Sequence, residues 1–144
     1  MNDLIKELYQ EIILDHGQTP RNFGECENHN KSAKGHNPLC GDTVKVTLVV
    51  DESNIIKDIK FSGEGCAISI ASASLMTVKL KNKSLSEANI IFDDFTNLIK
   101  GQTDNLKVIT EEDSLHALKG VTAFPMRVKC ATMSWHAYHS AVND

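Results

Sequence analysis

Two alternating apolar segments separated by a turn constrain the fold more than any other feature of this chain. In "TVKVTLVV" (43–50) apolar side chains recur at every second position, and "IIKDIKF" (55–61) resumes the same period. The intervening "DESN" (51–54) consists of residues that are typical of turns. We therefore expect an antiparallel hairpin over about residues 43–61, with one face of both strands buried.

The segment before the hairpin divides into a helix and a connection. Residues 4–13 repeat apolar side chains at helical spacing, and Gly17 with Pro20 ends this pattern. From Arg21 to Leu39 the periodicity vanishes, and polar residues and glycines dominate. We expect an amphipathic helix followed by an irregular connecting segment.

Helical patterns also fill the chain after the hairpin. Residues 67–80 are broadly apolar with many small serines and alanines, and Ser84 with Glu87 forms a capping box before an apolar stripe. Helices are expected over residues 67–80, 84–100, 114–119 and 125–142. The predicted fold class is therefore α+β, in which a small antiparallel sheet packs against an N-terminal helix and several C-terminal helices in a single domain, residues 1–144.

Charge and hydropathy exclude several classes of partner. The formal net charge is −4, and the basic residues are scattered along the chain, so no basic face is expected to attract nucleic acid or anionic lipid. No apolar run approaches the roughly 20 residues that cross a bilayer, and the N-terminus lacks the apolar core of a signal peptide. We therefore expect a cytoplasmic protein that binds neither nucleic acid nor membrane.

Three of the four cysteines occupy comparable places at the ends of predicted elements. In a reducing cytosol, thiols act more often as ligands or nucleophiles than as disulfides. Cys40 precedes the first strand of the hairpin and Cys66 follows the second, so the hairpin brings both to the same end of the sheet. Cys130 begins the last helix and must reach them by tertiary packing.

These thiols, together with a carboxylate, have the chemistry of a metal site. Zinc takes four ligands in a tetrahedron and accepts both thiolate sulfur and carboxylate oxygen. Ferrous iron or an iron–sulfur cluster can use the same donors, and spacing does not separate the two. A buried apolar role is the simpler interpretation of any one cysteine, but it fits poorly a thiol on a Pro/Gly turn. The candidate ligands are Cys40, Asp42, Cys66 and Cys130.

Other titratable residues have simpler interpretations. Cys26 lies in the irregular segment and is interpreted as an incidental thiol. His16 ends the first helix, where a cation suits the helix dipole. His136 and His139 have a spacing that can hold a metal, but we expect both on the surface.

Four segments in order resemble a known family. They are "LYQEIILDHGQTPRN" (8–22), "NPLCGD" (37–42), "FSGEGCAISIASASLM" (61–76) and "RVKCATMSW" (127–135). On these motifs the chain resembles the IscU and NifU N-terminal scaffold family of iron–sulfur cluster assembly, and most closely its SufU-type branch. The resemblance runs nearly end to end.

This resemblance implies an activity as well as a fold. In the SufU-type branch Cys40, Asp42, Cys66 and Cys130 would hold Zn²⁺. Cys40 matches the position that accepts sulfur as a persulfide from a SufS-type cysteine desulfurase, a pyridoxal-phosphate enzyme, and the protein would pass that sulfur to a downstream acceptor. It would thus act as a sulfurtransferase. Arg127 would steady the anionic sulfur or dock the partner, although an ordinary surface arginine is an equal alternative.

Two departures from the classical scaffold favour zinc over a cluster. Lys129 stands where the classical scaffold has a histidine before its last cysteine, and a protonated lysine does not bind a metal. The long segment between Cys66 and Cys130 also resembles the SufU-type insertion. Three functions remain open: zinc-dependent sulfur transfer, a scaffold on which an iron–sulfur cluster is assembled and transferred, and a zinc-stabilised interaction domain.

Overall fold

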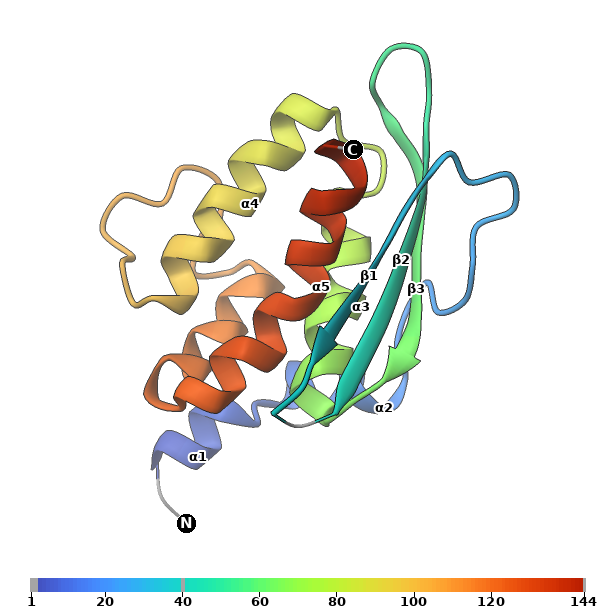
Figure 1. Ribbon diagram of the computed structural model, residues 1–144. Helices are drawn as coiled ribbons and strands as arrows, with labels where there is room; N and C mark the ends of the chain where they lie inside the picture. Colours follow the sequence, from blue (N-terminus) through green and yellow to red (C-terminus); the bar gives the residue numbers. More distant parts are fainter. Residues whose placement is uncertain (1–2, 40, 144) are drawn as a thin grey trace.

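The computed structural model describes residues 3–39 and 41–143, and it has the expected α+β class. A three-stranded antiparallel sheet has the strand order β1–β2–β3. In chain order the elements are α1 (Asp3–Leu8), α2 (Glu11–Gln18), β1 (Lys31–Asn37), β2 (Asp42–Val50), β3 (Ile56–Glu64), α3 (Ala67–Leu80), α4 (Leu85–Ile99), the 3-10 helix η1 (Ser114–Ala123) and α5 (Pro125–Asn143). Figure 1 shows α3 and α5 against the sheet, with α4 beyond α5.

The expected hairpin is formed by β2 and β3. Val46 lies opposite Phe61 and Leu48 lies opposite Ile59, and all four side chains are fully buried. These apolar pairs face α3 and α5, and burial of side chains of this size contributes about 1.5–3 kcal/mol each. The alternating pattern is thus explained by one sheet face covered by helices.

The prediction of an irregular segment from Arg21 to Leu39 is wrong for residues 31–37, because β1 forms there. Ala33 and Gly35 at its inward positions are small and half-buried, and Asn37 is polar and buried, so the strand lacks an apolar alternation. A side chain at Gly35 would meet Met133 of α5 at 3.1 Å. Close packing against α5 therefore requires the residue that weakens the pattern.

The N-terminal helix expected as one element is two. Its apolar spacing continues through both α1 and α2, but Gln10 between them has an extended backbone with φ −57° and ψ 156°. Side-chain periodicity is preserved across this break, so the sequence pattern does not report it.

The helices after the hairpin follow the prediction closely. α3 begins directly after Cys66, the capping box of Ser84 and Glu87 starts α4, and Pro125 opens α5. The short element from Ser114 is a 3-10 helix and extends to Ala123. Among the residues that the structure describes, no helix combines the length and apolar character needed to span a membrane.

Candidate metal centre

Three elements that are distant in the sequence bring a carboxylate and two thiols together. Asp42 is the first residue of β2, Cys66 is the N-cap of α3, and Cys130 lies in the second turn of α5. One ligand atom from each lies within 4.8 Å of the other two. In a tetrahedral zinc site neighbouring ligand atoms are about 3.5–3.8 Å apart, so binding would require these atoms to move together by up to about 1 Å. Cys40, the fourth predicted ligand, lies outside the described residues.

Two glycines allow the strand ends and α3 to approach this closely. Gly63 has φ 146°, and a side chain there would lie 2.2 Å from the carbonyl oxygen of Thr43. A side chain at Gly65 would lie 3.1 Å from the carboxylate of Asp42. Since real side chains do not tolerate the first of these contacts, the glycines of "SGEGC" let the chain turn from β3 into Cys66 beside Asp42.

The carboxylate of Asp42 is buried and oriented by α3. The Ser69 hydroxyl donates a hydrogen bond to Oδ2 of Asp42, and the backbone N–H of Cys66 donates to the same oxygen at 3.4 Å. The Ser69 hydroxyl also lies 3.6 Å from Sγ of Cys66. Such a contact outside the ligand set holds a ligand in its binding orientation.

Sequence reasoning did not identify Ser69 as part of the site. A weak signal was available, because a residue three positions after an N-cap points back toward that cap. Its contact with Asp42, however, joins residues 27 positions apart and depends on tertiary packing.

Arg127 places a positive charge beside the thiols. It lies one turn before Cys130 on α5, and its Nη1 donates to Sγ of Cys130 at 4.0 Å. Burial opposes the charged form, but the hydrogen bond to Cys130 and the attraction of Cys66 outweigh it, so the pKa of the Arg127 guanidinium is raised. Arg127 can therefore attract an anionic group that approaches this end of the sheet.

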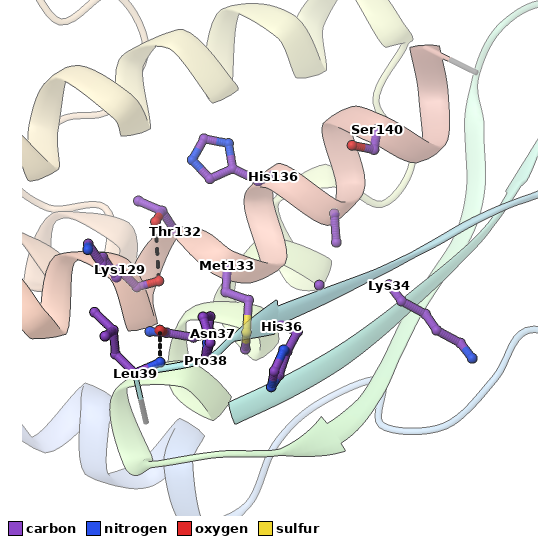
Figure 2. A pocket seen from close by; sticks show the side chains of 12 residues that line it. Lys34, His36, Asn37, Pro38, Leu39, Lys129, Thr132, Met133, His136 and Ser140 are labelled. Carbon is purple, nitrogen blue, oxygen red and sulfur yellow. Dashed lines mark hydrogen bonds between the residues drawn. The ribbon is translucent and has the colours of Figure 1, made fainter. Parts of the chain in front are cut away.

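The donor set fits a thiophilic metal ion. Two thiols and a carboxylate in a mostly buried setting would repel one another if all ionised without a cation, and a divalent ion offsets that repulsion. Lys129 is not part of this group. Its exposed side chain instead lines a groove that lies between β1 and α5 (Figure 2).

The remaining candidates lie apart from the centre. Cys26 is buried against β2, where its Sγ donates to the carbonyl oxygen of Thr47 at 3.4 Å. Burial raises the pKa of the Cys26 thiol, which suits a structural residue. His136 and His139 are exposed, as expected, and their rings contact Phe92.

The interpretation of His16 as a cation at the helix end is wrong. Its side chain is buried, and its Nδ1 lies 2.7 Å from the hydroxyl of Ser74 on α3. The Ser74 hydroxyl also accepts a hydrogen bond from the backbone N–H of Arg21. Burial lowers the pKa of the His16 imidazole, so the neutral ring is the favoured form.

Comparisons with known proteins agree with this architecture. The family model described as NifU-like N terminal domain matches residues 8–131. The zinc-dependent sulfurtransferase SufU of Bacillus subtilis (strain 168) is 38% identical over 141 residues, which cover 98% of this chain and 93% of that protein. The iron–sulfur cluster assembly scaffold protein IscU of Streptococcus pyogenes serotype M1 is 36% identical, with 96% and 84% covered.

Solved structures show the same fold. A putative iron–sulfur cluster assembly scaffold protein for the SUF system from Fervidobacterium islandicum AW-1 superposes with a TM-score of 0.83 at 32% identity, covering 95% of this chain and 98% of that one. The N-terminal part of a NifU-like protein from Brucella abortus superposes with a TM-score of 0.85 at 19% identity. The superposition covers 97% of this chain and 95% of the Brucella chain. The second likeness concerns the fold alone.

Proposed function

The chain belongs to the NifU-like N-terminal domain family of iron–sulfur cluster assembly proteins, and from that premise we propose that it is a zinc-dependent sulfur-transfer protein. The observation that carries the proposal is the convergence of Asp42, Cys66 and Cys130 within 4.8 Å. In this proposal Cys40 accepts persulfide sulfur from a cysteine desulfurase of the SufS type. The sulfur then passes to a downstream acceptor protein.

Four residues would hold the zinc ion: Cys40, Asp42, Cys66 and Cys130. When bound, zinc keeps coordinated thiols deprotonated at neutral pH. Two observations favour zinc over a cluster. The exposed Lys129 occupies the position before Cys130 where a histidine ligand would stand, and the B. subtilis relative is named a zinc-dependent sulfurtransferase.

The transfer step exchanges one sulfur–sulfur bond for another. The Cys40 thiolate attacks the outer sulfur of the donor's persulfide, a new S–S bond forms on Cys40, and the donor cysteine leaves as a thiolate. The electrons balance without an external oxidant or reductant. Passing the sulfur onward repeats the same displacement, with the acceptor's thiolate as the nucleophile and Cys40 as the leaving group.

Arg127 would assist by charge. Its guanidinium lies beside Sγ of Cys130 and is held in the charged form, so it can stabilise the anionic sulfur species that the exchange generates. Ser69 would act through Asp42, whose carboxylate it orients.

The decisive experiment compares two cysteine variants. Incubation with a cysteine desulfurase and free cysteine, followed by mass spectrometry, should show one added sulfur on the wild type and none on Cys40→Ala. Cys26→Ala is the matched control, because Cys26 is a buried thiol outside the candidate centre, and it should accept sulfur normally. Metal analysis should find about one zinc per chain. A Cys40→Ala variant that accepts sulfur at the normal rate contradicts the proposal.

Assembly of an iron–sulfur cluster on the same cysteines is the second candidate. It is favoured by the IscU relatives, at 36% identity in S. pyogenes and 33% in Escherichia coli (strain K12). In that case reconstitution with iron and sulfide would give a coloured species that transfers intact to an apo-acceptor. A third outcome, in which Cys40→Ala lowers stability without a specific loss of sulfur acceptance, would identify a zinc-stabilised interaction domain.

A further inference from the structure

A groove beside the candidate metal centre has no part in the function described so far. It encloses about 430 Å³ between β1 and α5 (Figure 2). One wall consists of residues 34–39, which are consecutive along the end of β1 and the turn after it. The other wall is formed by α5 residues from Lys129 to Ser140.

The first wall follows the edge of the sheet. β1 pairs with β2 on one side and is the outer strand of the sheet, so alternate N–H and C=O groups point away from β2. An extended peptide can pair with such groups and add a strand. Only residues 34–36 of this wall can offer edge groups, because the C=O of Asn37 accepts from Gly41, Pro38 has no N–H, and the N–H of Leu39 donates to Oδ1 of Asn37. At about 3.3 Å per residue, this stretch of strand spans about 10 Å and pairs with a segment of about three residues.

The side chains around the groove are basic. Figure 2 shows Lys34 and Lys129 at opposite ends, with His36 and His136 between them. Of the described residues that line the groove, none is Asp or Glu, although the whole chain has a net charge of −4. Neither lysine forms an ion pair with another residue in ranges 3–39 and 41–143. Separated cations suit spaced carboxylates on an extended chain better than one small anion.

The groove also has an apolar floor and an apolar end. Met133 of α5 is buried against Gly35 and forms part of the floor. Leu39 is 60% exposed at the end nearest the metal centre, where it offers an apolar contact to a bound segment. This combination of polar strand edge, separated cations and apolar contacts is typical of peptide-binding grooves.

The groove leads to the residues that would exchange sulfur. Asn37 of the first wall pairs with Asp42, and Lys129 of the second wall directly precedes Cys130, so both walls adjoin described residues of the candidate centre. We propose that this groove binds an extended, acidic segment of the sulfur-donating protein, which pairs with the outer edge of β1 at residues 34–36. The proposal rests on the proposed function, since it identifies the donor as the occupant.

Two measurements test the proposal on the double variant Lys34→Gln/Lys129→Gln. Lys100→Gln is the control, because it removes a lysine that lies outside the groove. Lys100 is exposed at the end of α4 and does not line the groove. In desulfurase assays the double variant should need about five to ten times more protein for half-maximal sulfur acceptance, with an unchanged rate at saturation. A labelled seven-residue peptide of alternating glutamate and threonine should bind the wild type, and bind the double variant about five to ten times more weakly. The same peptide with glutamine in place of glutamate should bind neither the wild type nor the double variant.

Each arm can overturn the proposal. An unchanged half-saturating concentration in the double variant shows that the donor does not use the groove, and equal binding of the two peptides shows that the groove does not select acidic segments. The peptide arm requires no sulfur chemistry. If Cys40→Ala accepts sulfur normally while the acidic peptide still binds through the two lysines, the proposed function fails and the acidic-peptide site remains.

Discussion

Two buried carboxylates in this protein have opposite surroundings. Asp94 on α4 is 2% exposed and accepts hydrogen bonds of 2.7–3.0 Å from the backbone N–H groups of residues 107–109. Asp42 is 6% exposed, accepts from the Ser69 hydroxyl, and lies beside two thiols. Burial alone therefore does not identify a functional carboxylate. The chemistry of its neighbours does, because N–H donors stabilise a carboxylate in place, whereas thiols around it form a ligand set for a cation.

The donors also show what each carboxylate organises. The three N–H groups bound by Asp94 belong to the connection between α4 and η1, so this side chain fixes that connection onto α4. Asp42 joins the start of β2 to the start of α3 through Ser69. The first arrangement is complete within the protein, whereas under the proposed function the second would gain stability from a bound metal ion.

The largest effect on stability is expected at Asp94. Asp94→Ala leaves three backbone N–H groups without their acceptor, and we expect a loss of about 3–4 kcal/mol in the free energy of unfolding. Denaturant unfolding measures it. The folded fraction should retain normal zinc affinity. Asp93→Ala is the control, since Asp93 is the exposed neighbour on the same helix, and it should change the unfolding free energy by less than about 0.5 kcal/mol.

Asp42→Ala should give the converse result. Loss of a direct ligand should weaken zinc binding by at least about 100-fold, measured by competition with a chelator of known affinity. The unfolding free energy of the zinc-free variant should change by no more than about 1 kcal/mol. Removing the carboxylate also removes its repulsion with the two neighbouring thiols, which offsets the lost hydrogen bonds. If the zinc-free variant is as unstable as Asp94→Ala, Asp42 is a structural residue and the comparison fails.

The difference between these carboxylates was only partly predictable from the sequence. Asp42 was identified because it stands on a turn two residues after a cysteine. Asp94 received no role, since an acid next to another acid on an amphipathic helix reads as part of a solvated face. Its partners lie 13–15 residues away in a connection without regular periodicity.

The same reasoning explains which elements were found. Strong periodicity predicted β2, β3, α3, α4 and α5, and the ends of those elements correctly located Cys66 and Cys130. β1 was missed because small side chains such as Gly35 pack beneath α5 and leave no apolar alternation. The groove depends on that strand lying beside a helix about 100 positions later, and no local pattern encodes such a neighbour.

A smaller effect is expected at Ser69. Ser69→Ala should weaken zinc binding about tenfold, because the Asp42 carboxylate loses the hydroxyl that orients it. Ser72→Ala is a matched control on the same helix, where the buried hydroxyl contacts Trp135 and the carbonyl oxygen of Ala131. It should lower the unfolding free energy by about 1 kcal/mol and leave zinc affinity unchanged. Equal zinc affinities in both variants would remove Ser69 from the site.

The smallest expected effect is a pH dependence of stability that arises at His16, outside the candidate metal centre. Nδ1 of His16 hydrogen bonds with the Ser74 hydroxyl, which also accepts from the backbone N–H of Arg21. Burial and then the charge of Arg21 lower the pKa of His16 in the folded state, while Asp15 opposes them. The stabilisation is therefore complete above the unfolded value of about 6.5 and is lost as the pH falls below it.

His16→Gln should accordingly flatten the acid side of the stability profile. We expect the unfolding free energy of zinc-free wild type to fall more steeply than that of the variant between about pH 6.5 and pH 5, with a difference of about 1 kcal/mol or less, as for one hydrogen bond. Using zinc-free protein removes the proton release that accompanies metal binding, and the other histidines contribute equally to both curves. Parallel curves would show that the contact between α2 and α3 does not depend on a neutral His16.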